Sequence, residues 1–82
     1  MDLRDIECFV AIAETGSITA ASTRLNRVQS GISTRLKNLE ETLGKNLFER
    51  QGKRLAISAA GERFLVAARD LLQQAENAKG LL

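Results

Sequence analysis

The stretch SITAASTRLNRVQSGISTRLKNLEETLG, residues 17–44, carries the strongest structural signal in this 82-residue chain. Ser17 is a good N-cap residue for a short helix that continues to about Leu25. A second helix is expected from Gln29 to Leu43, where a glycine follows as the C-cap residue. Between the two helices lies Asn26, a residue type that tolerates the left-handed backbone of a tight corner. The stretch therefore predicts a helix-turn-helix.

The second helix of this pair has an apolar face and a polar face. Its apolar side chains recur three or four residues apart, as they do in a helix that packs on a core; they are Ile32, Leu36, Leu39 and Leu43. The opposite face carries small polar and charged side chains. They are Ser30, Ser33, Thr34, Lys37 and Glu41.

The segments on either side complete a small domain. A first helix is expected from Asp2 to Gly16, and after Gly44 the pattern changes to two short strands, Leu47–Arg50 and Leu55–Ile57. We predict a mostly α fold of the winged helix-turn-helix type, with three helices and a β-hairpin wing, followed by a long helix.

This prediction divides the chain into a winged helix-turn-helix domain, residues 1–58, and a long helix, residues 59–82. At about 1.5 Å per residue that helix would be roughly 36 Å long, which is more than a core of this size can cover. We therefore expect it to pair with the same helix of a second copy. The predicted interface residues are Phe64, Leu65, Ala68, Leu72 and Ala75.

Charge is distributed unevenly along the chain. Residues 24–54 contain eight basic and three acidic residues, a local net charge of +5, whereas the rest of the chain has a net charge of −3. A positive region beside an acidic remainder is typical of a protein that meets polyphosphate with one face. An ordinary solvated surface with uneven charge is the alternative.

Composition excludes several other functions. With one cysteine and no histidine, the chain has no disulfide framework, Cys/His zinc site or His-based triad, so we expect no metal or cofactor. No acidic pair lies beside a nucleophile or a glycine-rich phosphate loop, and we therefore expect no enzyme activity. Three aromatic residues offer little stacking surface for unpaired bases, which favours duplex DNA as the ligand. No apolar run is long enough to span a bilayer, so we expect a cytoplasmic protein.

Two sets of residues are candidates for contacts with DNA. The N-terminal half of the second helix in the pair suits the major groove, where amide and hydroxyl side chains bond base edges; its candidates are Gln29, Ser30, Ser33 and Thr34. The candidates for backbone or minor-groove contacts are basic: Arg27, Arg35, Lys37, Arg50, Lys53 and Arg54.

Each candidate also has an ordinary structural explanation. Polar residues on the outside of an amphipathic helix are usually just solvated. Gln29 could be needed to cap its helix, because Val28 cannot accept the free amide hydrogens. The basic hairpin tip could be solvated, and Arg50 could pair with Glu49.

The order of elements, together with the residues in them, resembles the LysR-type transcriptional regulators. The matching pieces are Leu3 to Phe9, the run ETGSITAA from Glu14 to Ala21, LEETLG from Leu39 to Gly44, LFER from Leu47 to Arg50, and AGE from Ala60 to Glu62. The resemblance implies a prokaryotic, cytosolic regulator that binds promoter DNA, with two-fold related half-sites, as a homodimer or tetramer. It implies that residues 1–58 are the DNA-binding domain and that residues 59–82 are the linker helix for dimerisation. It also implies a separate effector domain, which we expect outside these 82 residues and through which alone a small-molecule inducer would act.

Two positions depart from the family pattern. Members commonly have Ser or Thr before the helix glutamine and often Pro after it, whereas Val28 and Ser30 flank Gln29 here. A basic residue is common where this chain has Thr34, with Arg35 following, so either residue of that pair is a candidate for the DNA contact. A winged-helix module that serves protein assembly is the alternative function, although its helix would need an apolar or acidic outer face.

Overall fold

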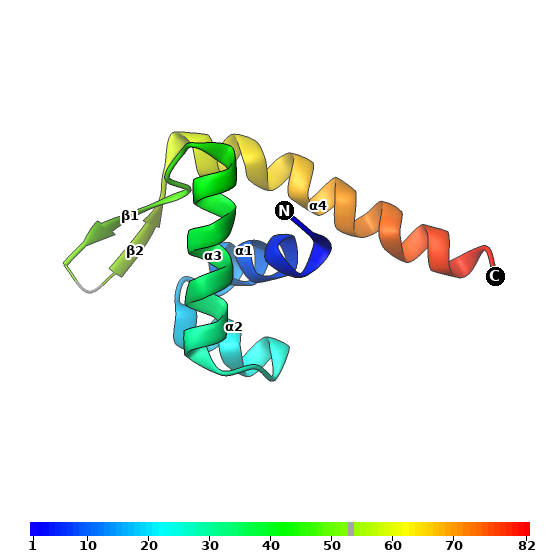
Figure 1. Cartoon of the computed structure of the whole chain (residues 1–82), viewed down its shortest axis with the longest axis horizontal. Helices are drawn as coiled ribbons and strands as arrows, with labels where there is room; N and C mark the ends of the chain where they lie inside the picture. Colours follow the sequence, from blue (N-terminus) through cyan, green and yellow to red (C-terminus); the bar gives the residue numbers. More distant parts are fainter. Residues whose placement is uncertain (53) are drawn as a thin grey trace.

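The computed structural model describes residues 1–52 and 54–82 and confirms the predicted fold class. Three helices form a helix-turn-helix domain, a two-stranded antiparallel hairpin follows, and a long helix completes the chain (Figure 1). In chain order the elements are α1 (Leu3–Thr15), α2 (Ile18–Leu25), α3 (Gln29–Leu43), β1 (Phe48–Gln51), β2 (Arg54–Ile57) and α4 (Ala59–Gly80).

Side-chain caps begin three of the four helices. The Asp2 carboxylate accepts hydrogen bonds from the amides of Arg4 and Asp5, at 2.8 and 3.1 Å, and Asp5 in turn accepts one from the amide of Asp2. Ser17 caps α2 and Ser58 caps α4, each through its hydroxyl oxygen at 3.0 Å from a helix amide. Each cap satisfies a backbone donor that would otherwise lack a partner.

The corner between α2 and α3 has the predicted left-handed residue. Asn26 has a φ of 54°, and the amide of Arg27 donates to the carbonyl of Ser22 at 3.0 Å. This bond closes the end of α2 and turns the chain sharply into α3. Val28 is the N-cap residue of α3 and makes no capping hydrogen bond with its side chain.

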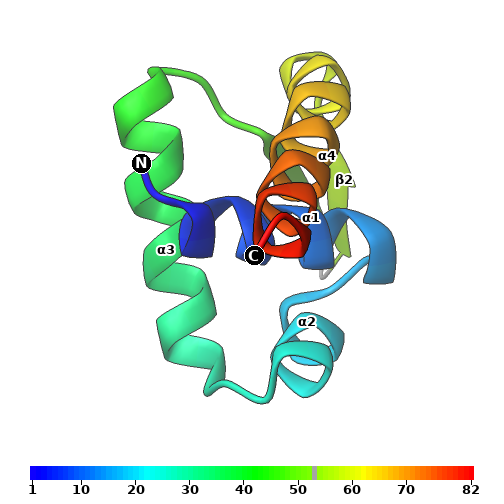
Figure 2. The same ribbon diagram turned by 90° about the vertical axis from the view of Figure 1, so that its right-hand side faces the viewer.

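The core lies around α1, which packs against α2, α3 and α4. Figure 2 shows α1 between α3 and α4. Phe9 is fully buried and its ring contacts those of Phe48 and Phe64, with centroids 5.5 and 5.4 Å apart. Ile32 and Leu39 of α3 are fully buried too, which confirms the predicted inner face of that helix.

The hairpin projects from the helices as a wing (Figure 1), with β1 mostly exposed beyond Phe48 and β2 half-buried beyond Arg54. Its register pairs Phe48 with Ile57 and Arg50 with Leu55, and Phe48 is the buried anchor at its base. The predicted contact residue Lys53 lies outside the described residues.

Helix α4 crosses α1 and then runs away from the rest of the molecule (Figure 1). Its first half contributes to the core of its own domain, where Ala68 has no exposed surface. The prediction that Ala68 lies on a dimer surface is therefore wrong, because the side chain is already covered by its own chain. None of the helices that the structure describes is both long and apolar enough to cross a membrane.

Candidate nucleic-acid interface

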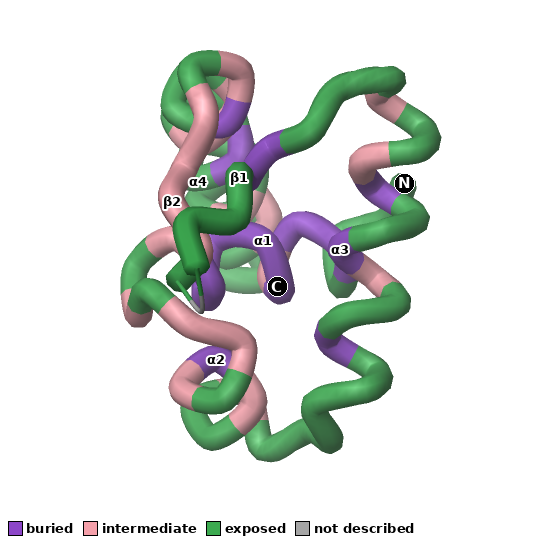
Figure 3. The backbone as a smooth tube through the Cα atoms, turned by 90° about the vertical axis from the view of Figure 1, so that its left-hand side faces the viewer, coloured by how far each residue is buried: buried purple, intermediate pink, exposed green. Residues whose placement is uncertain are grey.

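The exposed face of α3 begins at the corner with α2 and continues for two turns. All four predicted base-contact residues lie on it and are exposed; they are Gln29, Ser30, Ser33 and Thr34. In Figure 3 the buried positions of α3 are those that lie toward α1, and most of the other positions of the helix are exposed. This face therefore offers one amide and three hydroxyl side chains to a ligand.

Exposed cations lie next to this face and on the wing. Arg27 is in the corner before α3, and Lys37 is one turn beyond Ser33 on the same helix. On the wing, Arg50 and Arg54 are exposed in neighbouring strands. Across residues 1–52 and 54–82, no salt bridge involves any of these four cations.

A small hollow lies between the wing and the start of α2. It has a volume of about 180 Å³ and is lined by Arg50 and Leu55 from the wing and by Gly16, Ser17, Ile18 and Thr19 from the corner before α2. Thr19 was not among the predicted contact residues, because no local sequence pattern connects it to the strand that carries Arg50. Only the packing of the wing beside the α1–α2 corner brings them together.

Arg35 faces away from the exposed side of α3. Its Nη1 atom is 3.0 Å from Oδ1 of Asp5 and 3.6 Å from Oδ1 of Asp2, at the start of α1. The hydrogen bond with Asp5 raises the pKa of Arg35, and a backbone hydrogen bond from Asp5 is the main cause of the lowered pKa of Asp2. This geometry does not support the predicted phosphate contact of Arg35. Of the pair left open by the sequence, Thr34 is the exposed residue.

Glu14 binds two arginines and thereby connects three helices. Its Oε1 is 2.7 Å from Nη1 of Arg24 in α2, and its Oε2 is 3.0 Å from Nη2 of Arg69 in α4. The hydrogen bond from Arg24 is the main cause of the lowered pKa of Glu14. Arg24 is thus an internal partner, so the positive surface is smaller than the count along the sequence indicates.

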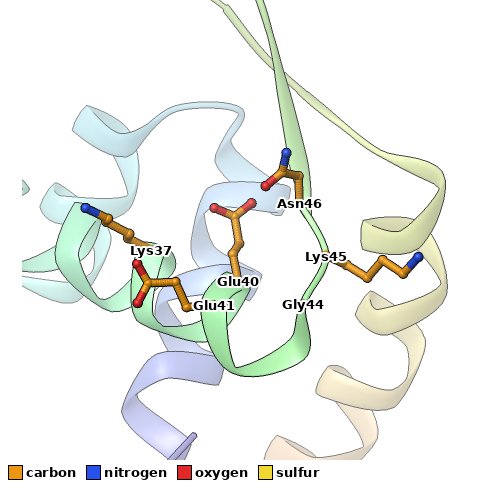
Figure 4. A pocket seen from close by; sticks show the side chains of 6 residues that line it. All are labelled: Lys37, Glu40, Glu41, Gly44, Lys45 and Asn46. Atoms are coloured by element: carbon orange, nitrogen blue, oxygen red, sulfur yellow. The ribbon is translucent and has the colours of Figure 1, made fainter.

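Glu40 holds the beginning of the wing against the end of α3. Its Oε2 accepts a hydrogen bond from the amide of Leu47 at 2.7 Å and a longer one from Phe48 at 3.4 Å. Figure 4 shows Glu40 between the helix and the segment that leads to β1, with Lys45 directed to the other side, toward α4. Lys37 and Lys45 therefore do not form a single cluster.

Comparison with known proteins agrees with this geometry. Residues 3–62 match the family described as bacterial regulatory helix-turn-helix protein, lysR family. The chain belongs to this family. The LysR-type resemblance noted in the sequence is thereby confirmed.

Curated relatives match along nearly the whole chain. It is 38% identical over 79 residues to the HTH-type transcriptional regulator CzcR of Bacillus thuringiensis subsp. konkukian, and 40% identical over 79 residues to the Hca operon transcriptional activator HcaR of Escherichia coli. Both alignments cover 96% of this chain and 27% of the relative. The chain thus spans about a quarter of the length of the curated relatives it matches.

Solved structures of DNA complexes have the same fold. The CbnR DNA-binding domain in its complex with DNA superposes with a TM-score of 0.92 at 36% identity, covering 98% of this chain and 92% of that one. The BenM DNA-binding domain in complex with benA site 1 DNA gives a TM-score of 0.92 at 33% identity, covering 99% and 91%.

The predicted interface residues on α4 of this LysR-family domain divide into two groups. Phe64, Leu65 and Leu72 are partly buried against the domain's own core, and Ala75 is half-buried further along. Leu71 was missed by the sequence analysis, although it is 39% exposed. Helical spacing could have predicted Leu71, since it lies seven residues after Phe64 and four before Ala75.

Proposed function

We propose that this domain binds double-stranded promoter DNA and reads its sequence with the N-terminal half of α3. The observation that carries the proposal is the exposed face of α3, whose amide and hydroxyl groups are accompanied by exposed cations in the corner before the helix, on the helix itself and on the wing. A major groove admits one helix and offers it hydrogen-bonding base edges. The likeness to domains solved in DNA complexes supports the same conclusion.

The two sets of side chains would have different tasks. Gln29, Ser30, Ser33 and Thr34 would bond base edges, which differ from one sequence to another. Arg27, Lys37, Arg50 and Arg54, together with Lys53, would neutralise phosphates, which are the same in every sequence. The hollow beside Arg50 is wide enough to receive a phosphate oxygen while the wing follows the DNA backbone. Sequence specificity and general affinity for DNA are therefore separable by mutation.

Substitutions on α3 should lower specificity and leave general affinity intact. Ser33→Ala or Gln29→Ala is expected to weaken binding to a selected duplex by roughly 1–3 kcal/mol, because a base-edge contact forms only at the right sequence. Binding to random-sequence DNA should hardly change. The measurement is a pair of affinity titrations, on a duplex selected by the wild-type domain from a random pool and on an unselected duplex.

Substitutions on the wing should lower affinity for every duplex. Arg50→Ala is expected to weaken binding to selected and random DNA alike. It should also reduce the slope of log K against log salt by about one unit, since each neutralised phosphate releases condensed counterions. Lys79→Ala removes a cation at the far end of α4 and serves as the matched control with an unchanged slope. If the α3 variants reduced the slope of log K against log salt and the wing variants left it unchanged, the assigned roles would be reversed.

We also propose that the domain forms a homodimer through α4. The exposed part of this helix carries Leu71 beside the partly exposed Phe64 and Ala75. An adjoining groove of about 340 Å³ continues the apolar surface and is lined by Leu43, Lys45, Leu47, Ala60, Arg63, Phe64 and Ala67. The occupant that suits a long helix with an uncovered apolar side is α4 of a second copy. Such a dimer would present two α3 helices to two-fold related half-sites.

A carboxylate at Leu71 should convert the dimer to monomers. Burying a leucine contributes roughly 1.5–3 kcal/mol per subunit, so Leu71→Glu is expected to raise the dissociation constant at least about a hundredfold. Val66→Glu is the control, because Val66 is 65% exposed and lies on a different side of α4. Sedimentation equilibrium measures both. A wild-type domain that stays monomeric at high concentration, or a dimer broken only by Val66→Glu, would contradict the proposed interface.

Assembly beyond the dimer and regulation by a small molecule would belong to the longer protein that the family implies. Because bacterial promoters lie in the cytoplasm, we propose that the protein acts there. The function proposed for this domain needs no cofactor.

A further inference from the structure

The side chain of Val28 contributes little to the stability of the free domain. Its side chain is 73% exposed, so it gains little from burial. It occupies the N-cap position of α3, where Ser, Thr, Asp or Asn would bond a free helix amide, and it makes no such bond. The residue directly before the exposed face of α3 is therefore an apolar group with no partner inside the domain.

Its position separates Val28 from the other exposed hydrophobic residues. Single exposed hydrophobic side chains are common and need no explanation by themselves. The other large ones that the structure describes lie at the start of the chain or along and just after α4: Met1, Leu3, Val66, Leu71, Leu81 and Leu82. Val28 is the one that lies beside residues proposed for DNA contact, since it lines a hollow together with Ser30 and Thr34.

Val28 projects beside the N-terminal turn of α3. A Cβ atom built on Gly31 would lie 3.7 Å from Cγ2 of Val28, in van der Waals contact, so the missing side chain at Gly31 leaves this methyl group uncovered. On either side are shallow hollows, one lined by residues that include Ser30 and Thr34 and the other by residues that include Asn26 and Arg27. A base edge that approaches Ser30 would pass close to the valine.

We propose that Val28 recognises a thymine through the C5 methyl group in the major groove. This inference rests on the proposed function and names one element of the sequence that the domain reads. The thymine methyl is the one apolar feature among the base edges of that groove, and apolar side chains contact it. The side chain of Val28 has no hydrogen-bond donor or acceptor, so it cannot bond the polar edges of the other bases.

Uracil in place of thymine tests the contact at single positions. A duplex selected by the wild-type domain is resynthesised with deoxyuridine at one thymine at a time, which removes only the methyl group. Wild type is expected to lose about fourfold in affinity at one thymine in each half-site, a factor that corresponds to about 0.8 kcal/mol for one buried carbon group. Val28→Ala should bind the thymine and uracil duplexes equally at that position.

Two further variants separate recognition from folding. Val66→Ala is the matched control, since it truncates the same residue type at similar exposure and should keep the wild-type pattern. Val28→Ser supplies the missing cap and should raise the melting temperature while the thymine preference is lost. A thymine preference that persists in Val28→Ala or Val28→Ser, or is absent from wild type, overturns the inference. Failure to select any duplex would instead contradict the proposed function.

Discussion

Replacing Gly61 by alanine is expected to destabilise the domain by about 3 kcal/mol or more, at the upper end of the range for overpacking. Gly61 is in the first turn of α4, where a Cβ atom would clash with the carbonyl oxygen of Leu47 and lie 2.7 Å from Cγ1 of Ile57. The carbonyl cannot retreat easily, because it accepts the amide of Ser58 at 2.9 Å. The helix or the base of the wing must therefore shift.

Gly80 provides the matched control for this substitution. It is the last residue of α4, and a Cβ atom there would have no neighbour within 4 Å. Gly80→Ala should leave the stability unchanged or raise it by a few tenths of a kcal/mol, because alanine restricts the unfolded chain. Urea denaturation monitored by circular dichroism measures both variants. Equal midpoints for the two would show that α4 does not pack closely on the base of the wing.

Phe9→Ala is expected to cost about 3–5 kcal/mol, the usual range for removing a buried aromatic side chain. The total stability of a chain of this length is roughly 4–12 kcal/mol. The loss would be large because the Phe9 ring contacts Phe48 at the base of the wing and Phe64 on α4. The variant should be partly or wholly unfolded at 37 °C and bind no DNA specifically.

Phe9→Leu distinguishes the loss of volume from the loss of the ring. Leucine fills most of the space, so the expected cost is about 1–2 kcal/mol and the domain should remain folded. Thermal melts followed by circular dichroism give the two values. If Phe9→Ala lowered the melting temperature by only a few degrees, the aromatic cluster would not be the centre of the core.

Local signals in the sequence predicted most of the architecture. Asp2, Ser17 and Ser58 each act on helix amides no more than three residues away, and Asn26 adopts the left-handed backbone at the corner. Such features depend on neighbours in the chain, which a sequence displays directly. The inner face of α3 was also predictable, since helical periodicity alone decides which side chains share a face.

The candidate site was predicted less completely, because exposure depends on distant parts of the chain. Arg24 and Arg35 look like two more cations of a positive patch until α1 supplies Glu14 and Asp5 as their partners. Ala68 looks like part of a helix interface until the fold of its own domain buries it. None of these contacts has a fixed spacing along the sequence.

By itself the sequence determined the capped helices, the corner, the hairpin and the polar face of α3, because each arises from interactions within a few residues. Only the tertiary structure decided which charges remain free for DNA, which side of α4 remains open, and that Arg50 lies beside Thr19. Those outcomes depend on how the elements pack on α1. A side chain is available to a partner only if no other part of its own chain has already covered or neutralised it.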